Sequence, residues 1–189
     1  MANPTSCYLP LLILSTLSIV LHVLLIDHNI VAATSNNDEV SLIRQSCKAT
    51  SVPDTCISVL EADSRSRSAT ELKSLTRISM DIVYEEAIGL KSLFIKAKEN
   101  VTDPVLKRSA RQCIDSFEDC SNHIKNVGIP DFEKGNYREA NGDVDFCVVC
   151  AYDCMDTGIK LFNREIVTLY DFSGDVLDFL NMLHSLRNM

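Results

Sequence analysis

The chain has 189 residues and carries 18 Lys and Arg against 26 Asp and Glu, so its formal net charge is −8. This length suits a single domain. The acidic balance argues against nucleic acid as a partner, because phosphate binding needs a basic stripe, and it is compatible with a basic protein partner. The chain has no Trp, six Gly and five Pro, which disfavours turn-rich β folds and favours long helices. Its eight Cys indicate an oxidising compartment or a metal site.

The N-terminal segment has the pattern of a secretory signal. Residues 9–26 are almost wholly apolar, and Val31 and Ala33 are small residues of the kind that signal peptidase prefers. We expect residues 1–33 to be a signal peptide, and the mature protein to be secreted and free of a membrane segment. The apolar run approaches the about 18–20 residues that span a bilayer, so an uncleaved anchor is the alternative. Cleavage is favoured because no basic cluster flanks the run.

Removal of residues 1–33 leaves 156 residues with seven Cys, two His and a net charge of −7. On a secretory route thiols tend to be oxidised to disulfides. Asn100 begins the chain's sole Asn-x-Ser/Thr sequence in which x is not Pro, and it is the predicted glycosylation site, the alternative being that this sequence is not used.

The mature chain begins with a short helical hairpin, predicted over residues 34–62. Apolar residues at helical spacing lie on each side of a turn that contains Pro53, a residue well suited to start a helix. Cys47 and Cys56 flank this turn, so a disulfide between them would staple the hairpin. Residues 64–68 are polar and are expected to break the helix. Ser68 is then placed to cap the following helix, with Glu71 completing a capping box.

Four long amphipathic helices are predicted over residues 68–188, because apolar side chains recur there every three or four residues. The first runs from residue 69 to about 100. The second starts at Thr102 or Asp103, with Pro104 in its first turn, and ends at residues 128–130. The third extends from about 132 to 158 and the fourth from about 163 to 186, with a candidate break at residues 171–175. These helices predict an all-α fold, an antiparallel up-down-up-down four-helix bundle on which the hairpin packs.

Four cysteines set a register between the second and third bundle helices. Cys113 and Cys120 lie seven residues apart on one helix, and Cys147 and Cys154 lie seven apart on the next, so each pair faces one way. In antiparallel neighbours the disulfides Cys113–Cys154 and Cys120–Cys147 can form together, which leaves Cys150 as a free thiol. The alternative is Cys120–Cys150 with Cys147 free; we favour Cys120–Cys147.

A metal site and a thioredoxin-like redox site are the competing interpretations of the cysteine cluster, and neither is favoured. The redox site would need a strand before the Cys-x-x-Cys pair and a helix N-terminus at its first Cys, and the sequence shows neither. A metal ion would be bound by three thiolates, those of Cys147, Cys150 and Cys154. Its fourth ligand would be either His123 or Cys120. Structural zinc sites present Cys from turns, whereas this stretch is helical, so we expect no metal and no cofactor. His123 and His184 are isolated, and no phosphate-binding loop or nucleophile motif is present. The pattern is typical of a small secreted binder or inhibitor rather than an enzyme.

The cysteine layout and its flanking residues resemble the plant invertase and pectin methylesterase inhibitor family. The matching segments cover almost all of residues 38–187: Leu42-Ile43, Ser46-Cys47-Lys48, Thr50, Pro53 and Cys56 in the hairpin, then residues 60–66, 102–107, 135–141 and 154–156. The resemblance implies that Cys47–Cys56 and Cys113–Cys154 are the family's two disulfides. Cys120, Cys147 and Cys150 are additional to that pattern, and Gly158 replaces an apolar residue. The Pro-Lys-Phe motif of invertase-binding members is missing near residues 135–137.

The resemblance implies a monomeric inhibitor in the plant cell wall that covers the carbohydrate-binding cleft of a pectin methylesterase in a one-to-one complex. Inhibition of an acid invertase is the alternative, and a secreted non-inhibitory protein with a redox-active or dimer-forming Cys150 is a further one. The predicted interface candidates are the polar residues on the outward face of the second bundle helix, with a solvated face as the alternative: Asp115, Glu118, Asp119 and Asn122.

Overall fold

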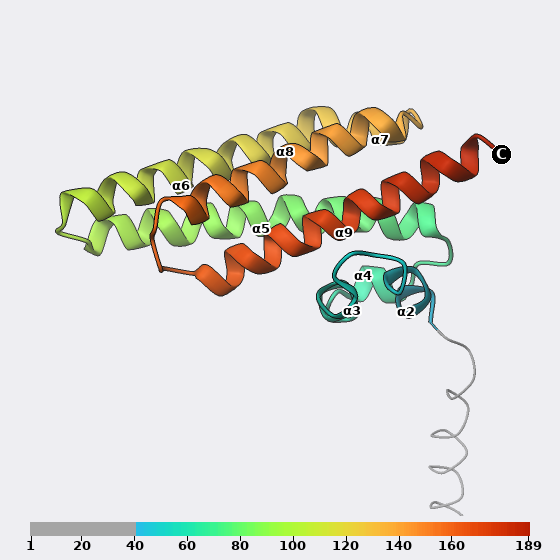
Figure 1. Ribbon diagram of the computed structural model, residues 1–189, viewed down its shortest axis with the longest axis horizontal. Helices are drawn as coiled ribbons and strands as arrows, with labels where there is room; N and C mark the ends of the chain where they lie inside the picture. Colours follow the sequence, from blue (N-terminus) through green and yellow to red (C-terminus); the bar gives the residue numbers. More distant parts are fainter. Residues whose placement is uncertain (1–40) are drawn as a thin grey trace, which may run out of the picture. The chain divides into compact units, whose positions relative to one another are not determined.

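The protein was analysed as a computed structural model, which describes residues 41–189; the predicted signal peptide and residues 34–40 lie outside the described residues. Residues 41–189 contain helices and no strand, which confirms the all-α prediction (Figure 1). Three short helices lead into four long helical segments.

The N-terminal hairpin consists of α2 (Leu42–Cys47) and α3 (Pro53–Ala62), and a single helical turn, α4 (Ser64–Arg67), follows it. Ser41 caps α2 through its side chain, and Pro53 occupies the first turn of α3, where its missing N–H costs nothing. The predicted polar break at residues 64–68 is wrong, because the Asp63 carboxylate accepts the N–H groups of Arg65 and Ser66 and so starts α4.

The bundle is built from α5 (Leu72–Asn100), α6 (Pro104–His123), α8 (Tyr137–Asp156) and α9 (Asn163–Arg187), and short connections make sequential helices antiparallel. Each helix packs on two others in the cyclic order α5, α6, α8, α9. Their apolar stripes share one core that includes five fully buried Phe side chains: Phe94, Phe117, Phe132, Phe172 and Phe179. Asp103, one of the two caps that the sequence predicts, accepts the N–H groups of Val105 and Leu106 and so caps α6.

The second bundle helix does not end at residues 128–130 as predicted. It continues through a π-helical turn, η2 (Ile124–Gly128), into α7 (Ile129–Glu133), and the third long helix begins at Tyr137 instead of near Phe132. Pro130 lacks an N–H, and its ring clashes with the carbonyl four residues earlier in a regular helix. The wider π turn relieves that conflict, and the chain turns instead at Gly135, whose φ is +80°.

Two other boundary predictions are also wrong. The Ser68 hydroxyl donates to the Arg65 carbonyl in α4, so it does not cap α5, and Glu71 precedes α5 without a side-chain capping bond. No break interrupts α9 at residues 171–175. The helix continues because Phe172 and Asp175 are buried there, and Asp175 is held by the neighbouring hairpin.

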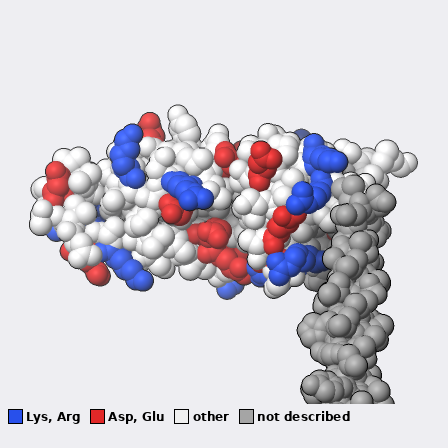
Figure 2. All heavy atoms as spheres, turned by 90° about the horizontal axis from the view of Figure 1, so that it is seen from below, with Lys and Arg blue, Asp and Glu red and all other residues white. Residues whose placement is uncertain are grey.

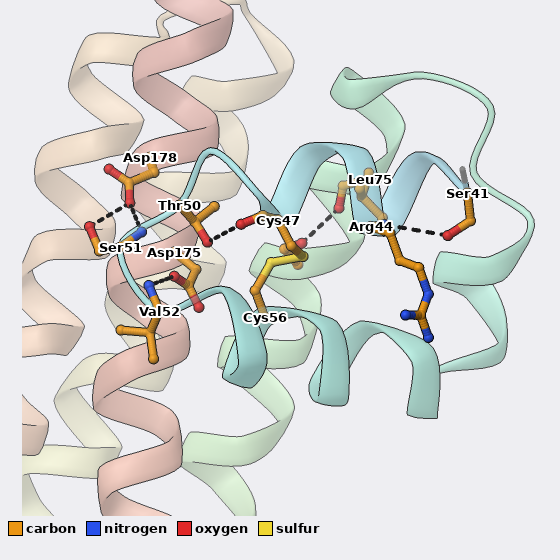
Figure 3. Close-up of a disulfide and its surroundings, with 11 residues drawn as sticks. Ser41, Arg44, Cys47, Thr50, Ser51, Val52, Cys56, Leu75, Asp175 and Asp178 are labelled. Atoms are coloured by element: carbon orange, nitrogen blue, oxygen red, sulfur yellow. Dashed lines mark hydrogen bonds between the residues drawn. A yellow bond between two sulfur atoms is a disulfide. The ribbon is translucent and has the colours of Figure 1, made fainter. Parts of the chain in front are cut away.

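The turn of the hairpin is fastened to α9 by two carboxylates (Figure 3). Asp178 accepts hydrogen bonds from the Ser51 N–H and hydroxyl, both at 2.8 Å, and Asp175 accepts the Val52 N–H at 2.9 Å. Asp175 is fully buried, and its second carboxylate oxygen has no hydrogen-bond partner among the described residues. Burial raises the pKa of Asp175 to about 6, opposed by the Val52 hydrogen bond. The ionised form of Asp175 is therefore destabilised in the folded protein.

Charges of both signs are interspersed on the face of the described residues that Figure 2 shows. Among residues 41–189 no helix combines the length and the apolar character needed to cross a bilayer.

Candidate functional site

Helices α6 and α8 are joined by two disulfides at their shared boundary. Cys113 pairs with Cys154 and Cys120 with Cys147, and the Cα atoms lie 4.8 Å apart in both bridges. These are the pairs that the helical register predicts. The two bridges lie two turns apart, so they fix both the spacing of the helices and their register along the bundle. The surface carried by α6 and α8 is thereby preorganised.

The hairpin has its own bridge. Cys47 pairs with Cys56, with a Cα separation of 5.6 Å, as the flanking positions around Pro53 predict. Both cysteines are fully buried, and Figure 3 shows the bridge between them. The bridge joins α2 to α3 on the side of the hairpin that carries the turn fastened to α9, so it stabilises the hairpin without contributing an exposed surface.

An apolar stripe lies on the outside of α8, which the sequence reasoning missed. Phe146, Val149 and Tyr152 are 38%, 47% and 57% exposed. They follow one another every three residues, so consecutive members of the row are neighbours, and the row winds about 120° around the exposed side of the helix, away from the buried seam of Cys147, Ala151 and Cys154. The spacing was visible in the sequence as a second apolar stripe beside that seam. Exposed apolar groups in a row on a rigid helix are typical of contact surfaces.

The predicted polar candidates on α6 are all exposed, but the structure divides them. Glu118 turns toward α5 and pairs with Lys91 at 3.0 Å. Asp115, Asp119 and Asn122 remain exposed on α6, and Asp119 lies near Cys150 of α8. Because the disulfides set the register, Asp115 lies level with the end of the apolar stripe at Tyr152, and Asn122 lies level with its beginning.

A carboxylate from α8 completes this surface. Asp153 is exposed and lies one helical turn beyond Val149. Asp119 and Asp153 both lie near enough to the Cys150 thiol to affect its pKa. We define the α6–α8 face as Asp115, Asp119, Asn122, Phe146, Val149, Tyr152 and Asp153. It combines an apolar centre with acidic groups at its margins.

One edge of this face is held by His123. Its Nε2 lies 2.9 Å from the Asp143 Oδ1, and its ring lies 4.8 Å from that of Phe146, measured between ring centroids. The Phe146 ring is therefore supported from α6 as well as by its own helix. Gly128 allows the close approach at this point, since a Cβ there would lie 3.1 Å from the Asp143 Cβ. The edge is well packed before any partner binds.

Cys150 is the one cysteine of the described residues outside a disulfide. Only 5% of it is exposed. Burial raises the pKa of the thiol to about 11, and the nearby Asp119 and Asp153 charges act in the same direction. A thiol needs to ionise to attack a disulfide or an oxidant, so this environment makes Cys150 unreactive.

The other predicted sites lie as follows. Of the candidate metal ligands, Cys120, Cys147 and Cys154 are bound in disulfides, and within residues 41–189 no group of three or more His, Cys, Asp or Glu is arranged to hold a metal ion. Asn100 is exposed at the last turn of α5, with its side-chain amide donating to the Lys96 carbonyl at 2.9 Å.

Comparison with known proteins gives one family match. The family model described as plant invertase/pectin methylesterase inhibitor matches residues 41–164. A pectinesterase inhibitor from Actinidia deliciosa is 33% identical over 78 residues, which are 41% of this chain and 42% of that protein. A putative pectinesterase/pectinesterase inhibitor from Arabidopsis thaliana is 31% identical over 78 residues, 41% of this chain and 8% of that protein. The chain thus spans less than half the length of either relative.

Solved structures agree at the level of the fold. A mutant form of a pectin methylesterase inhibitor from Arabidopsis matches with a TM-score of 0.66 and 20% identity, over 75% of this chain and 97% of that one. A second Arabidopsis inhibitor structure matches with a TM-score of 0.57 and 20% identity, over 77% of this chain and 97% of that one.

Proposed function

Because the chain belongs to the plant invertase/pectin methylesterase inhibitor family, we propose that it is a secreted protein inhibitor of a pectin methylesterase. In this proposal the protein forms a one-to-one complex with the esterase in the plant cell wall and excludes pectin from its substrate cleft. The family model is described as one of inhibitors of plant invertase and pectin methylesterase. The relatives named as pectinesterase inhibitors support the esterase as the target.

We propose the α6–α8 face as the inhibitory surface, and one observation carries this assignment: two disulfides lock the helices that present it. A surface that is rigid before binding loses little conformational entropy when it docks. Tyr152 and Phe146 can enter apolar hollows of the partner, as aromatic anchors do in other interfaces. The acidic margins favour association with a basic esterase, faster at low salt than at high salt.

The target is tested by mixing the purified mature protein separately with a plant pectin methylesterase and with an acid invertase and assaying each across acidic pH. Loss of esterase activity alone supports the proposal. Loss of invertase activity alone supports the alternative target, and unchanged activity of both enzymes contradicts an inhibitory role.

The surface is tested with Tyr152→Ala, which removes the most exposed side chain of the apolar stripe. If it is an anchor, the inhibition constant rises roughly 30-fold or more, the size of a hot-spot residue. Leu186→Ala is the matched control, because Leu186 is also 57% exposed and lies on α9. Equal inhibition by both variants contradicts the assignment of this face.

The acidic margin is tested with the double variant Asp119→Asn, Asp153→Asn. We expect slower association with the esterase at low salt and little change at high salt, since exposed charges steer encounter more than they hold the complex. Glu99→Gln with Asp54→Asn is the control of equal charge change at two exposed positions elsewhere. Identical association rates for the two double variants contradict electrostatic steering by this margin.

A role based on Cys150 chemistry is disfavoured by the burial of its thiol and by its raised pKa. A thiol count on the native protein distinguishes a redox or dimer-forming role of Cys150 from an inhibitor in which Cys150 is a buried, structural thiol. We expect no rapid reaction with a thiol reagent until the protein is denatured, and then one thiol per mature chain. A disulfide-linked dimer, or rapid modification of the native protein, contradicts this expectation.

A further inference from the structure

The end of the bundle where α5 passes into α6 is basic, although the chain as a whole is acidic. Residues 94–111 and 157–164 carry seven cations and two carboxylates: Lys96, Lys98, Lys107, Arg108, Arg111, Lys160 and Arg164 against Glu99 and Asp103. The net charge of these two segments is +5, whereas the rest of the described residues carry −10. We call these two segments the basic end.

The two segments pack together in the fold. The Phe94 ring meets that of Phe162 at 5.3 Å between centroids, and the Ser109 hydroxyl donates to the Thr157 carbonyl at 3.5 Å. The Cys113–Cys154 disulfide closes the same end of the bundle. The cations of both segments therefore contribute to one local field.

These cations form no ion pair with the described carboxylates. None of the seven lies within 4.0 Å of a carboxylate oxygen of residues 41–189, whereas Arg44, Arg65, Arg77, Lys91 and Lys134 each form an ion pair. The folded core thus gives no reason for the clustering.

The arrangement on α6 is also locally unfavourable. Lys107 and Arg111 are four residues apart and Arg108 and Arg111 three apart, so like charges are neighbours on an exposed helix face. Lys107 also lies at the end of the first turn of α6, where the helix dipole disfavours a cation. A charge pattern that opposes helix stability and has no compensating partner in the fold indicates a role in binding.

We propose that the basic end binds a linear polycarboxylate polysaccharide, and the choice of polymer rests on the proposed function. Removal of methyl esters from pectin leaves free carboxylates spaced along the chain, so a methylesterase surrounds itself with this polyanion. Unpaired Lys and Arg side chains bind such a chain with release of counterions, and the affinity therefore depends steeply on salt. The basic end would hold the inhibitor on the polymer that its target produces.

The test uses the purified mature protein, with no esterase present, and measures binding to fully de-esterified polygalacturonate and to a highly methylesterified polymer of the same length. We expect binding to the de-esterified polymer only, weakened about tenfold or more between roughly 50 and 200 mM salt. The triple variant Lys107→Glu, Arg108→Glu, Arg111→Glu should bind at least about tenfold more weakly than the native protein.

The matched control is Lys48→Glu, Lys73→Glu, Arg138→Glu, which changes the net charge by the same amount. These three residues are exposed, form no ion pair with the described carboxylates and lie outside the basic end. Thermal melting of both variants checks that each is folded.

Equal weakening by both triple variants overturns the proposal, because it would mean that net charge alone controls binding. Equal binding to both polymers, or tighter binding to phosphatidylserine vesicles than to polygalacturonate at equal anion concentration, also overturns it. The outcome is independent of the proposed function. A protein that inhibits the esterase but does not bind polygalacturonate refutes only this inference, and one that binds the polymer without inhibiting refutes only the inhibitory role.

Discussion

Replacement of Asp175 by Asn is predicted to remove a pH dependence of folding stability that this single carboxylate creates. Asp175 is fully buried on α9 and accepts the Val52 N–H from the hairpin turn, with Thr50 beside it on the hairpin and the carboxylates of Asp171 and Asp178 on its own helix. An Asn side chain has the same shape and keeps a carbonyl oxygen for the Val52 N–H, but it cannot ionise. The substitution therefore isolates the effect of the charge.

The sign and size follow from the pKa of Asp175, which burial raises from 3.8 to about 6. An acid whose pKa is higher in the folded state stabilises the fold fully below the unfolded pKa, and this stabilisation is lost as the pH rises through the folded pKa. A difference of about two pKa units corresponds to about 3 kcal/mol. The native protein should lose this amount between roughly pH 4 and pH 7, and Asp175→Asn should not.

The assay is urea unfolding followed by circular dichroism at several pH values between about 4 and 8. Other carboxylates titrate in both proteins, so the informative quantity is the difference in unfolding free energy between them. We expect a difference near zero at pH 4 and a more stable variant, by up to about 3 kcal/mol, at pH 7.5.

The control is Asp178→Asn, which removes a carboxylate that accepts two hydrogen bonds from Ser51 at the same junction. This variant should lose roughly 1–3 kcal/mol at neutral pH, because charge-assisted bonds are weakened. The reasoning is refuted if Asp175→Asn retains the native pH profile, or if it is less stable than the native protein at pH 7.5.

Three further predictions concern the covalent and steric restraints. Replacement of both Cys120 and Cys147 by Ala should lower the unfolding free energy by about 3–4 kcal/mol, the loop-closure entropy of a bridge 27 residues apart; a loss below about 1 kcal/mol in urea unfolding argues against this bridge. Gly128→Ala should destabilise the fold by about 1–3 kcal/mol, since the added Cβ lies 3.1 Å from the Asp143 Cβ. Gly89→Ala should stabilise it by roughly 0.5–1 kcal/mol, since nothing lies within 4 Å of the added Cβ. A higher melting temperature for Gly128→Ala than for Gly89→Ala contradicts the packing around η2. Cys150→Ser should fold with the same three disulfides, because Cys150 takes part in none of them; peptide mapping that finds Cys120 newly unpaired in this variant contradicts the pairing.

The helices and their partners could be predicted from the sequence because two periodic signals agree. Apolar residues at three- and four-residue spacing define the helices, and cysteines seven residues apart define the register between α6 and α8. That register permits Cys113–Cys154 and Cys120–Cys147 together and favoured this pairing over the alternative Cys120–Cys150. A helix cap could be predicted where a capping side chain directly precedes a Pro in the first turn of the helix, as Asp103 precedes Pro104.

The failures occur where tertiary contacts override a local rule. Pro130 is a helix terminator in an isolated pattern, but a π turn accommodates it because η2 packs on α8 and α5. The sequence around Gly174 predicts a helix break, but α9 continues there because the Val52 N–H of the hairpin donates a hydrogen bond to Asp175. The Val52–Asp175 hydrogen bond joins residues 123 positions apart, and η2 packs on helices that are not adjacent to it in the local pattern, so neither contact can be inferred from the residues around it.

The candidate surface was predicted in part. The exposed polar residues of α6 were identified from their spacing, but the diversion of Glu118 to Lys91 depends on how α5 packs beside α6. The apolar row of α8 is short and has three-residue spacing, unlike the alternating three- and four-residue spacing of the buried seam, so the pattern of the core did not point to it. The basic end was not predicted either, because the net charge of −8 is a sum over the chain and contains no information on where the charges lie.

The most direct test of the central claim is a titration of a purified plant pectin methylesterase with the purified mature protein, with the residual release of methanol from pectin as the readout. At enzyme concentrations well above the dissociation constant, we predict that activity falls linearly and is abolished at one equivalent of protein. Full esterase activity at a several-fold excess of folded protein would contradict the claim that this disulfide-locked bundle is a pectin methylesterase inhibitor.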